Sequence, residues 1–459
     1  MTVFNTCSGS ASLVAGVSSD GGFRELYGEL YSSGSEAAQR AEAFLREQLA
    51  GAAELPCDLP DTPEQLLSWA EKHCADVARD YASYLAERQH GAGRRYFTNK
   101  AHALYFLQRV APTKEVDGAW LEGVLDHWRD HRFDGLLTTY LEELGEGDPR
   151  QNHVRIYRTL LAEHDCDDQQ GLDDEHFLQG AIQLALGGCG TDFMPEVIGY
   201  NLGYEQLPLH LLISAYELRE LGIDPYYFTL HVTIDNVSSG HGRKAVQSLL
   251  ELMPLDDGRE EFYRRVALGY RLNDLGLGST AVIQSFELQH EVIAMLERKR
   301  VFGQHMHSDY CRLEGQTVNQ WLSSPGHVAD FLAAMERKGW IKRHRSPDES
   351  RFWQLIEGST AAMFGVFSGY EKQLIHDWIA GDWQAPKQRP ALHRDHDSAC
   401  VDSSTPDDPE LKSLRDSLGN QAPQQQLEAL KPWLSAQRHH RPAGLFATRR
   451  FIELRARLR

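Results

Sequence analysis

Two polar residues, His231 and Asp235, lie four positions apart in an otherwise apolar stretch of the chain. On a helix this spacing places both side chains on one face, one turn apart. Because the surrounding residues are apolar, that face points inward, and a buried imidazole and carboxylate each need a partner. A divalent cation satisfies both groups. The alternative is a core histidine paired with an aspartate, and these two residues alone do not decide between the two interpretations.

A metal at this position needs further ligands from other helices, and Glu143 with His153 is the first candidate pair. Glu143 ends one predicted helix before Gly145, and His153 lies in the first turns of the next. On one regular helix the two side chains would point about 80° apart. The Gly-Asp-Pro interruption at residues 147–149 resets the geometry, so both can face one point. Without a metal, the pair would be an exposed helix end and a surface histidine.

The second candidate lies before a helix connection at Gly222. Residues at similar distances from the turn of an antiparallel helix pair lie at the same level. Glu205 precedes Gly222 by 17 residues, while Asp235 and His241 follow it by 13 and 19. Glu196 lies farther from the turn, so Glu205 is the better ligand and Glu196 the reserve. Either glutamate alone also fits a solvated helix face.

As an ordered set, these residues resemble the ligand pattern of the heme-oxygenase-like non-haem diiron oxidases, a family of iron-containing redox enzymes. That pattern is a glutamate and then a histidine, a second glutamate on a later helix, and His-x3-Asp-x2-His on the helix after that. The sequence at residues 110–113, 116–121 and 143–147 is also similar to members of the family. The resemblance covers residues 95 to 250.

One position departs from the pattern. The final histidine should stand where this chain has Ser238, and the nearest imidazole is that of His241. On a continuous helix His241 would point about 80° away from His231. We therefore expect residues 238–240 to break or bulge the helix and bring His241 to the site. Without that break, the second metal has one ligand fewer and binds weakly or only with substrate.

The resemblance implies an all-α, heme-oxygenase-like helical bundle that binds two Fe(II) ions per chain, the second more labile, with O2 as co-substrate. The implied reaction is N-oxygenation, desaturation or oxidative C–C fragmentation of a small amine, amino acid or amino-acid derivative in natural-product biosynthesis. Imidazole and carboxylate ligands without thiolate suit Fe(II) or Mn(II). The implied catalytic, metal-binding residues are Glu143, His153 and His231 on the first iron, Asp235 and His241 on the second, and Glu205 bridging or adjacent.

Helices must position these ligands. Between residues 95 and 298 apolar residues recur with helical spacing between short Gly/Pro connections, which predicts a bundle of about six or seven helices. Residues 1–94 are predicted to be an N-terminal helical extension with a Ser/Gly-rich start and two or three amphipathic helices. Residues 299–383 read as an aromatic-rich, mostly helical C-terminal domain. Residues 384–425 are predicted to be a linker or disordered segment, and 426–459 a basic helix.

Composition limits the class of protein. A length of 459 residues favours two domains and a tail. The formal charge of -19 disfavours nucleic acid or an anionic membrane as the main partner. The seven cysteines never form a CxxC motif, and neither a signal peptide nor a long apolar span is evident, which favours a cytoplasmic protein. A small-molecule substrate, an external electron donor and a homodimer are compatible with this interpretation.

Two alternatives belong to other classes. Residues 338–341 and 350–353 fit the turn and short strands of a winged-helix-like unit, but the basic cluster at residues 342–345 is short for a nucleic-acid footprint. The alternative function is a non-catalytic helical regulator, whose C-terminal unit binds a partner and whose His/Asp face only packs.

Overall fold

The protein is described by a computed structural model over residues 22–32, 35–234, 240–304, 310–358, 363, 365–384 and 408–459. Most of these residues are helical, and almost none of them lie in strands. The described strands are β1 (Arg312–Leu313) and β2 (Gln316–Thr317), which form one short antiparallel pair. The predicted all-α class is therefore confirmed. No helix in this part of the chain is both long and apolar enough to cross a membrane.

The N-terminal extension contains three helices, α1 (Phe23–Ser32), α2 (Ser35–Ala53) and α3 (Leu66–Gln89), which confirms the amphipathic helices predicted there. Helices α1 and α2 pack on α7 (Leu178–Gly188), and α3 packs on α9 (Leu209–Glu220) and α11 (His241–Leu252). The Ser/Gly-rich start lies almost entirely outside the described residues.

The central region contains more helices than the sequence predicted. Eleven α-helices are described between Lys100 and Gly303, so the estimate of six or seven is wrong. Local breaks divide stretches that apolar periodicity alone would join; α8, for example, ends at Tyr204, shortly before Pro208 and α9. Besides α7, α9 and α11, these helices are α4 (Lys100–Lys114), α5 (Asp134–Glu143), α6 (His153–Glu163), α8 (Met194–Tyr204), α10 (Tyr226–Ile234), α12 (Arg259–Arg271), α13 (Ser279–Gln284) and α14 (Leu288–Gly303).

Helices α8 and α12 make an unusually close contact that fixes one wall of the bundle. A Cβ atom at Gly199 would lie 1.9 Å from the carbonyl oxygen of Val266, and one at Gly269 would lie 2.0 Å from that of Glu196. Only glycine permits this approach. The contact holds α8, and with it the chain leading to Glu205, against α12.

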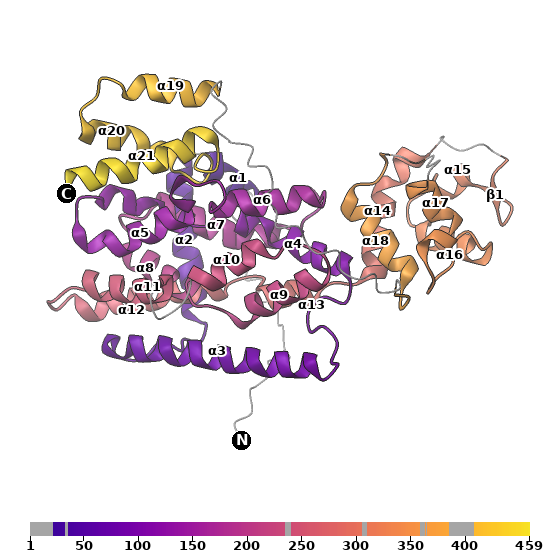
Figure 1. Cartoon of the computed structure of the whole chain (residues 1–459), viewed down its shortest axis with the longest axis horizontal. Helices are drawn as coiled ribbons and strands as arrows, with labels where there is room; N and C mark the ends of the chain where they lie inside the picture. The colour runs from indigo at the N-terminus through magenta and orange to yellow at the C-terminus, as the bar shows by residue number, and fades with distance from the viewer. Residues whose placement is uncertain are drawn as a thin grey trace.

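The C-terminal segment covers the opposite side of the bundle from α3 (Figure 1). It contains α19 (Pro409–Leu418), α20 (Pro423–Leu430), a 3-10 turn η8 (Lys431–Trp433) and α21 (Pro442–Leu458). Helix α19 lies within residues 384–425, which were predicted to be a linker or disordered segment, so the structure differs from the prediction there. Leu411, Leu414 and Leu418 recur at helical spacing and are buried in the same core as the bundle, which outweighs the Pro- and Asp-rich composition. The predicted domain boundaries stay predictions.

Helices α14 to α18 form a lobe beside the bundle (Figure 1). Its further helices are α15 (Val318–Trp321), α16 (Val328–Arg337), α17 (Arg351–Glu357) and α18 (Gly369–Ala380), and α18 packs on α4 of the bundle. The short strand considered at residues 350–353 is wrong, because Phe352 and Ile356 are buried at helical spacing in α17. A winged-helix-like unit would need a strand at residues 350–353, and the structure has helix α17 there instead.

Candidate metal centre

Buried carboxylates and imidazoles meet in two overlapping clusters among the described residues. In each cluster, one ligand atom from every member lies within 4.8 Å of the others. The members are at most 4% exposed. Glu143 belongs to both clusters, so the two form one continuous centre. The first cluster consists of Asp117, Glu143, His153 and His231, and the second of Glu143, Glu205 and His241.

Most of these side chains lie at helix ends. Glu143 is the last residue of α5 and Glu205 directly follows α8, whereas His153 and His241 are the first residues of α6 and α11. His231 lies within α10. Ligands at helix ends can be aimed independently, because a turn rather than the helical repeat sets their direction.

The turn between Glu143 and His153 has the predicted interruption and depends on glycine. Gly145 has a φ of 64°, and a Cβ atom there would lie 2.4 Å from the backbone nitrogen of Asn152. A residue with a side chain would be strained at this position. The tight turn reverses the chain so that the end of α5 and the start of α6 face the same place.

Asn152 ties the two sides of this turn together. Its Oδ1 accepts a hydrogen bond from the backbone nitrogen of Arg155 at 3.0 Å and caps α6. Its Nδ2 donates to the carbonyl oxygen of Leu144 at 3.0 Å and lies 2.9 Å from Nδ1 of His439. One side chain therefore links the residue after Glu143, the helix that begins at His153, and the C-terminal segment.

The imidazole of His231 is oriented by its own helix. Its Nδ1 lies 2.7 Å from the carbonyl oxygen of Tyr227. Because a carbonyl oxygen only accepts, Nδ1 carries the proton and donates it. The other nitrogen, Nε2, faces Oδ2 of Asp117 at 3.3 Å. This arrangement, with one ring nitrogen fixed and the other directed at the cluster, is typical of a metal-binding histidine.

His241 is oriented in the same way by a carboxylate. Its Nε2 lies 2.7 Å from Oε2 of Glu142, which also pairs with Lys244. Burial would raise the pKa of Glu142, but hydrogen bonds from His241 and Lys244 outweigh burial and lower that pKa. Glu142 is therefore ionised and accepts. The Nδ1 atom of His241 faces Oε2 of Glu205 at 3.1 Å and Oε1 of Glu143 at 3.4 Å.

The contact between His153 and Glu143 indicates a place for a cation. Nδ1 of His153 and Oε2 of Glu143 lie 2.5 Å apart, yet neither atom makes a hydrogen bond within the described residues. The rings of His153 and His231 have centroids 4.4 Å apart. Buried polar atoms without a hydrogen bond are costly, and a shared positive ion is one way to stabilise them.

Asp117 is a member of the centre that the sequence reasoning missed. It lies between α4 and the 3-10 helix η2 (Ala119–His127). Tyr204 donates a hydrogen bond to its Oδ1 at 2.7 Å, and Tyr227 donates to its Oδ2 at 2.6 Å. Burial would raise the pKa of Asp117, but the charges of Lys114 and the nearby histidines outweigh burial and lower it. Burial and the charge of Asp117 raise the pKa of both tyrosines, which keeps them protonated as donors.

A signal for Asp117 existed in the sequence. The residue stands in the stretch 116–121, which is similar to the family, but it has no helical spacing to any other ligand. Only the three-dimensional structure shows that this turn reaches the centre.

Five of the six predicted ligands lie together in these clusters, and Asp235 lies outside the described residues. Helix α10 ends at Ile234 and α11 starts at His241 after Gly240, so the two imidazoles of His231 and His241 belong to separate helices. The reserve ligand Glu196 is not at the centre. Both of its oxygens pair with Arg265 of α12, at 2.7 and 2.6 Å.

The chemistry of the donor set fits iron. The described ligands are three carboxylates and three imidazoles, with no thiolate among them. Structural zinc sites in proteins favour thiolate and a closed tetrahedron, whereas mixed oxygen and imidazole ligands suit Fe(II) or Mn(II).

Comparison with known proteins gives an independent result. Residues 104–274 match the family described as iron-containing redox enzymes. The match spans every described ligand and agrees with the all-α, heme-oxygenase-like fold. No curated protein and no solved structure matches the chain. The family and the buried cluster together indicate an iron-dependent oxidoreductase.

Proposed function

We propose that this chain, which through residues 104–274 belongs to the iron-containing redox enzymes, is a non-haem diiron oxidase that activates O2. The observation that carries the proposal is the presence of Glu143 in both ligand clusters. Carboxylates that contact two metal ions are the usual means by which a helical protein holds a diiron pair.

In this proposal Glu143 is the shared ligand. Asp117, His153 and His231 complete the first site, and Glu205 and His241 the second, with Asp235 added as the family resemblance implies. Glu143 would be the ligand common to both irons, whereas the resemblance gave Glu205 as bridging or adjacent. The four carboxylates would carry four negative charges, which equals the charge of two Fe(II) ions and limits the cost of burying them.

The chain's own residues prepare the centre for this chemistry. Two ferrous ions bound there would supply the electrons that reduce O2 while the substrate is oxidised. Tyr204 and Tyr227 hold both oxygens of Asp117 in place, and Lys114 donates a hydrogen bond to the hydroxyl oxygen of Tyr204 at 2.8 Å. The burial of all six described ligands excludes bulk water and strengthens electrostatic interactions within the centre.

The proposed substrate is a small amine, an amino acid or a derivative of one. N-oxygenation, desaturation and oxidative C–C fragmentation are the candidate reactions, in natural-product biosynthesis, and an external donor would return the iron to the ferrous state. The family resemblance supports this part of the proposal.

Iron loading of the full chain tests the diiron centre. After anaerobic addition of Fe(II) and removal of excess metal, elemental analysis should find two irons per chain, and Mössbauer spectra should change on exposure to O2. Glu143→Gln should lose both irons, because it removes a ligand from both clusters. Glu196→Gln is the matched control, since it alters an equally buried carboxylate outside the centre.

The outcomes separate the alternatives. One iron in the folded wild-type chain would contradict the diiron assignment but retain an iron enzyme. No iron above background in a folded sample would favour the non-catalytic regulator. For a loaded enzyme, O2 consumption with amines and amino acids then identifies the substrate class.

A further inference from the structure

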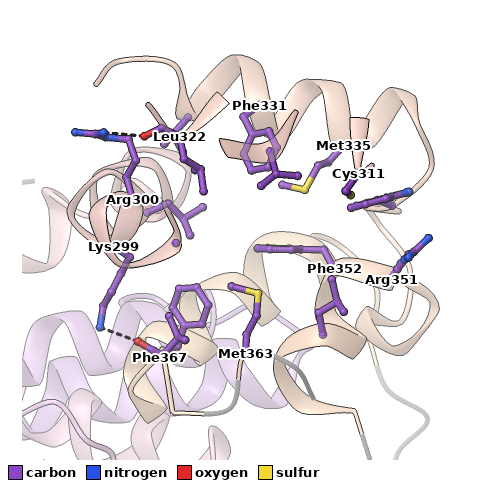
Figure 2. A pocket seen from close by; sticks show the side chains of 17 residues that line it. Lys299, Arg300, Cys311, Leu322, Phe331, Met335, Arg351, Phe352, Met363 and Phe367 are labelled. Atoms are coloured by element: carbon purple, nitrogen blue, oxygen red, sulfur yellow. Dashed lines mark hydrogen bonds between the residues drawn. The ribbon is translucent and has the colours of Figure 1, made fainter. Parts of the chain in front are cut away.

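The α14–α18 lobe contains an apolar pocket, partly open to solvent, that the proposed iron chemistry does not use. The pocket has a volume of about 240 Å³. Figure 2 shows Phe331, Met335, Phe352, Met363 and Phe367 directed toward one common space. None of the metal ligands lines it, and Figure 1 shows the lobe beside the bundle rather than within it.

The size and lining of the pocket point to a ligand with an apolar body. Packed protein interiors leave few voids larger than a water molecule. An apolar cavity of about 150 Å³ can remain dry and bind a molecule such as benzene. The present pocket is larger, and its methionines can adapt to different shapes because their side chains are flexible and polarisable.

Three cationic side chains, those of Lys299, Arg300 and Arg351, lie at the edge of the pocket. Lys299 pairs with Glu371 at 2.8 Å and donates a hydrogen bond to the carbonyl oxygen of Val366 at 3.0 Å. Arg300 lies 3.6 Å from Glu297 and donates to the carbonyl oxygen of Leu322 at 2.7 Å (Figure 2). These two charges are thus already balanced by acidic side chains.

Arg351 is different. Its guanidinium lies 4.5 Å from the ring centroid of Trp340, and among the described residues no acidic side chain forms an ion pair with it. The side chain is exposed at the edge of the pocket. A cationic ligand would be repelled at this edge, whereas a carboxylate would find an arginine whose planar fork suits it.

We propose that the lobe binds an amphipathic carboxylate, with an aliphatic or aromatic body in the pocket and the acid group at Arg351. The volume suits a body of on the order of ten carbon atoms. The site is an accessory one, separate from the metal centre, and it does not depend on iron.

Calorimetry on the full-length protein tests this site with three ligands of equal chain length: decanoate and decyltrimethylammonium below their micelle concentrations, and decanol below its solubility limit. Decanoate should bind with one site per chain, decanol about two- to fivefold more weakly, since an exposed ion pair contributes little, and the cation most weakly. The Arg351→Gln variant should bind decanoate only as tightly as the wild type binds decanol. Arg345→Gln, in the same lobe but outside the pocket lining, should change nothing.

Met335→Trp should abolish binding because the indole fills the cavity, and Leu355→Trp, at a less buried lining position, gives the same test if the first variant fails to fold. Glu143→Gln should bind decanoate like the wild type, so failure of the iron proposal leaves this result intact. Absence of decanoate binding to folded wild type, or binding retained in a folded pocket-filling variant, would overturn the site. Equal affinities for decanoate and decanol would overturn the role of Arg351.

Discussion

The metal centre in the bundle and the pocket in the α14–α18 lobe are two interiors with opposite chemistry. The centre is made of buried carboxylates and imidazoles, most of them at helix ends, and hydrogen bonds orient several of them, as the one from Tyr227 orients Asp117. The pocket is lined mainly by methionines, phenylalanines and other apolar side chains. Hydrogen bonds depend on direction and hydrophobic contacts hardly do. The centre therefore needs a fixed geometry, while the pocket needs mainly volume.

This difference predicts that the two regions respond to different changes. A substitution in the lobe should alter stability without altering iron binding. A substitution around the centre should lower the iron affinity strongly even where it changes the packing of side chains only slightly.

Leu332→Ala should cost about 2–5 kcal/mol of unfolding free energy, because the side chain is buried in α16 and its removal leaves a cavity. The iron content should not change. Urea denaturation followed by far-UV circular dichroism, with elemental analysis of the folded protein, measures both. Asp330→Ala on the exposed side of the same helix is the control, expected within about 0.5 kcal/mol of wild type. Loss of iron in folded Leu332→Ala would show that the regions are coupled.

Removal of iron should act on the bundle alone. With free Fe(II) at a hundredfold its Kd, bound metal stabilises the native state by about 2.7 kcal/mol, and chelation removes this contribution. Hydrogen exchange read by mass spectrometry should show faster exchange in α5, α6 and α10 after chelation, and unchanged exchange in α16 and α17. Equal changes in both regions would refute the separation.

Asn152→Ala should lower iron affinity about tenfold, because residues that orient metal ligands typically contribute tenfold or more. It should also cost about 1 kcal/mol through loss of the α6 cap. Asn152→Asp is the informative partner variant: it keeps an oxygen for the cap but cannot donate to Leu144. Competition with a ferrous chelator measures the affinity. Wild-type affinity in Asn152→Asp would show that the cap alone matters.

The smallest effect concerns pH at a contact outside both regions. Hydrogen bonds from Arg459 outweigh burial and, with Arg455, lower the pKa of Asp134 below its ordinary value of 3.8. A carboxyl whose folded pKa is depressed contributes stability above pH 3.8, and this contribution is lost as the pH falls through the lower folded value. Because the pair is partly exposed, the contribution should be under about 1 kcal/mol.

Thermal melts of wild type and Asp134→Asn from pH 3 to 6 measure this contribution. The variant should be less stable at pH 6, and the difference should shrink toward pH 3. A difference that is independent of pH would assign the effect to packing rather than to charge.

The parts of the site that follow local rules could be predicted from the sequence. Glu143 and His153 flank a Gly- and Pro-containing turn, and the start of a new helix at His241 follows from Gly240. The prediction from the sequence was wrong where two local signals indicated different structures. Leu411, Leu414 and Leu418 form the buried face of α19 inside a stretch whose composition resembles a linker. The number of helices was underestimated because apolar periodicity continues across turns.

By itself, the sequence determined the all-α class and the residue types of a metal centre without thiolate, because helical periodicity and side-chain chemistry are local properties. Only the tertiary structure decided that Asp117 joins the centre, that Glu196 pairs with Arg265 instead, and that Glu143 is common to both clusters. These outcomes depend on distances between segments far apart in the chain. Such distances arise from the packing of whole helices, which no spacing along the sequence specifies.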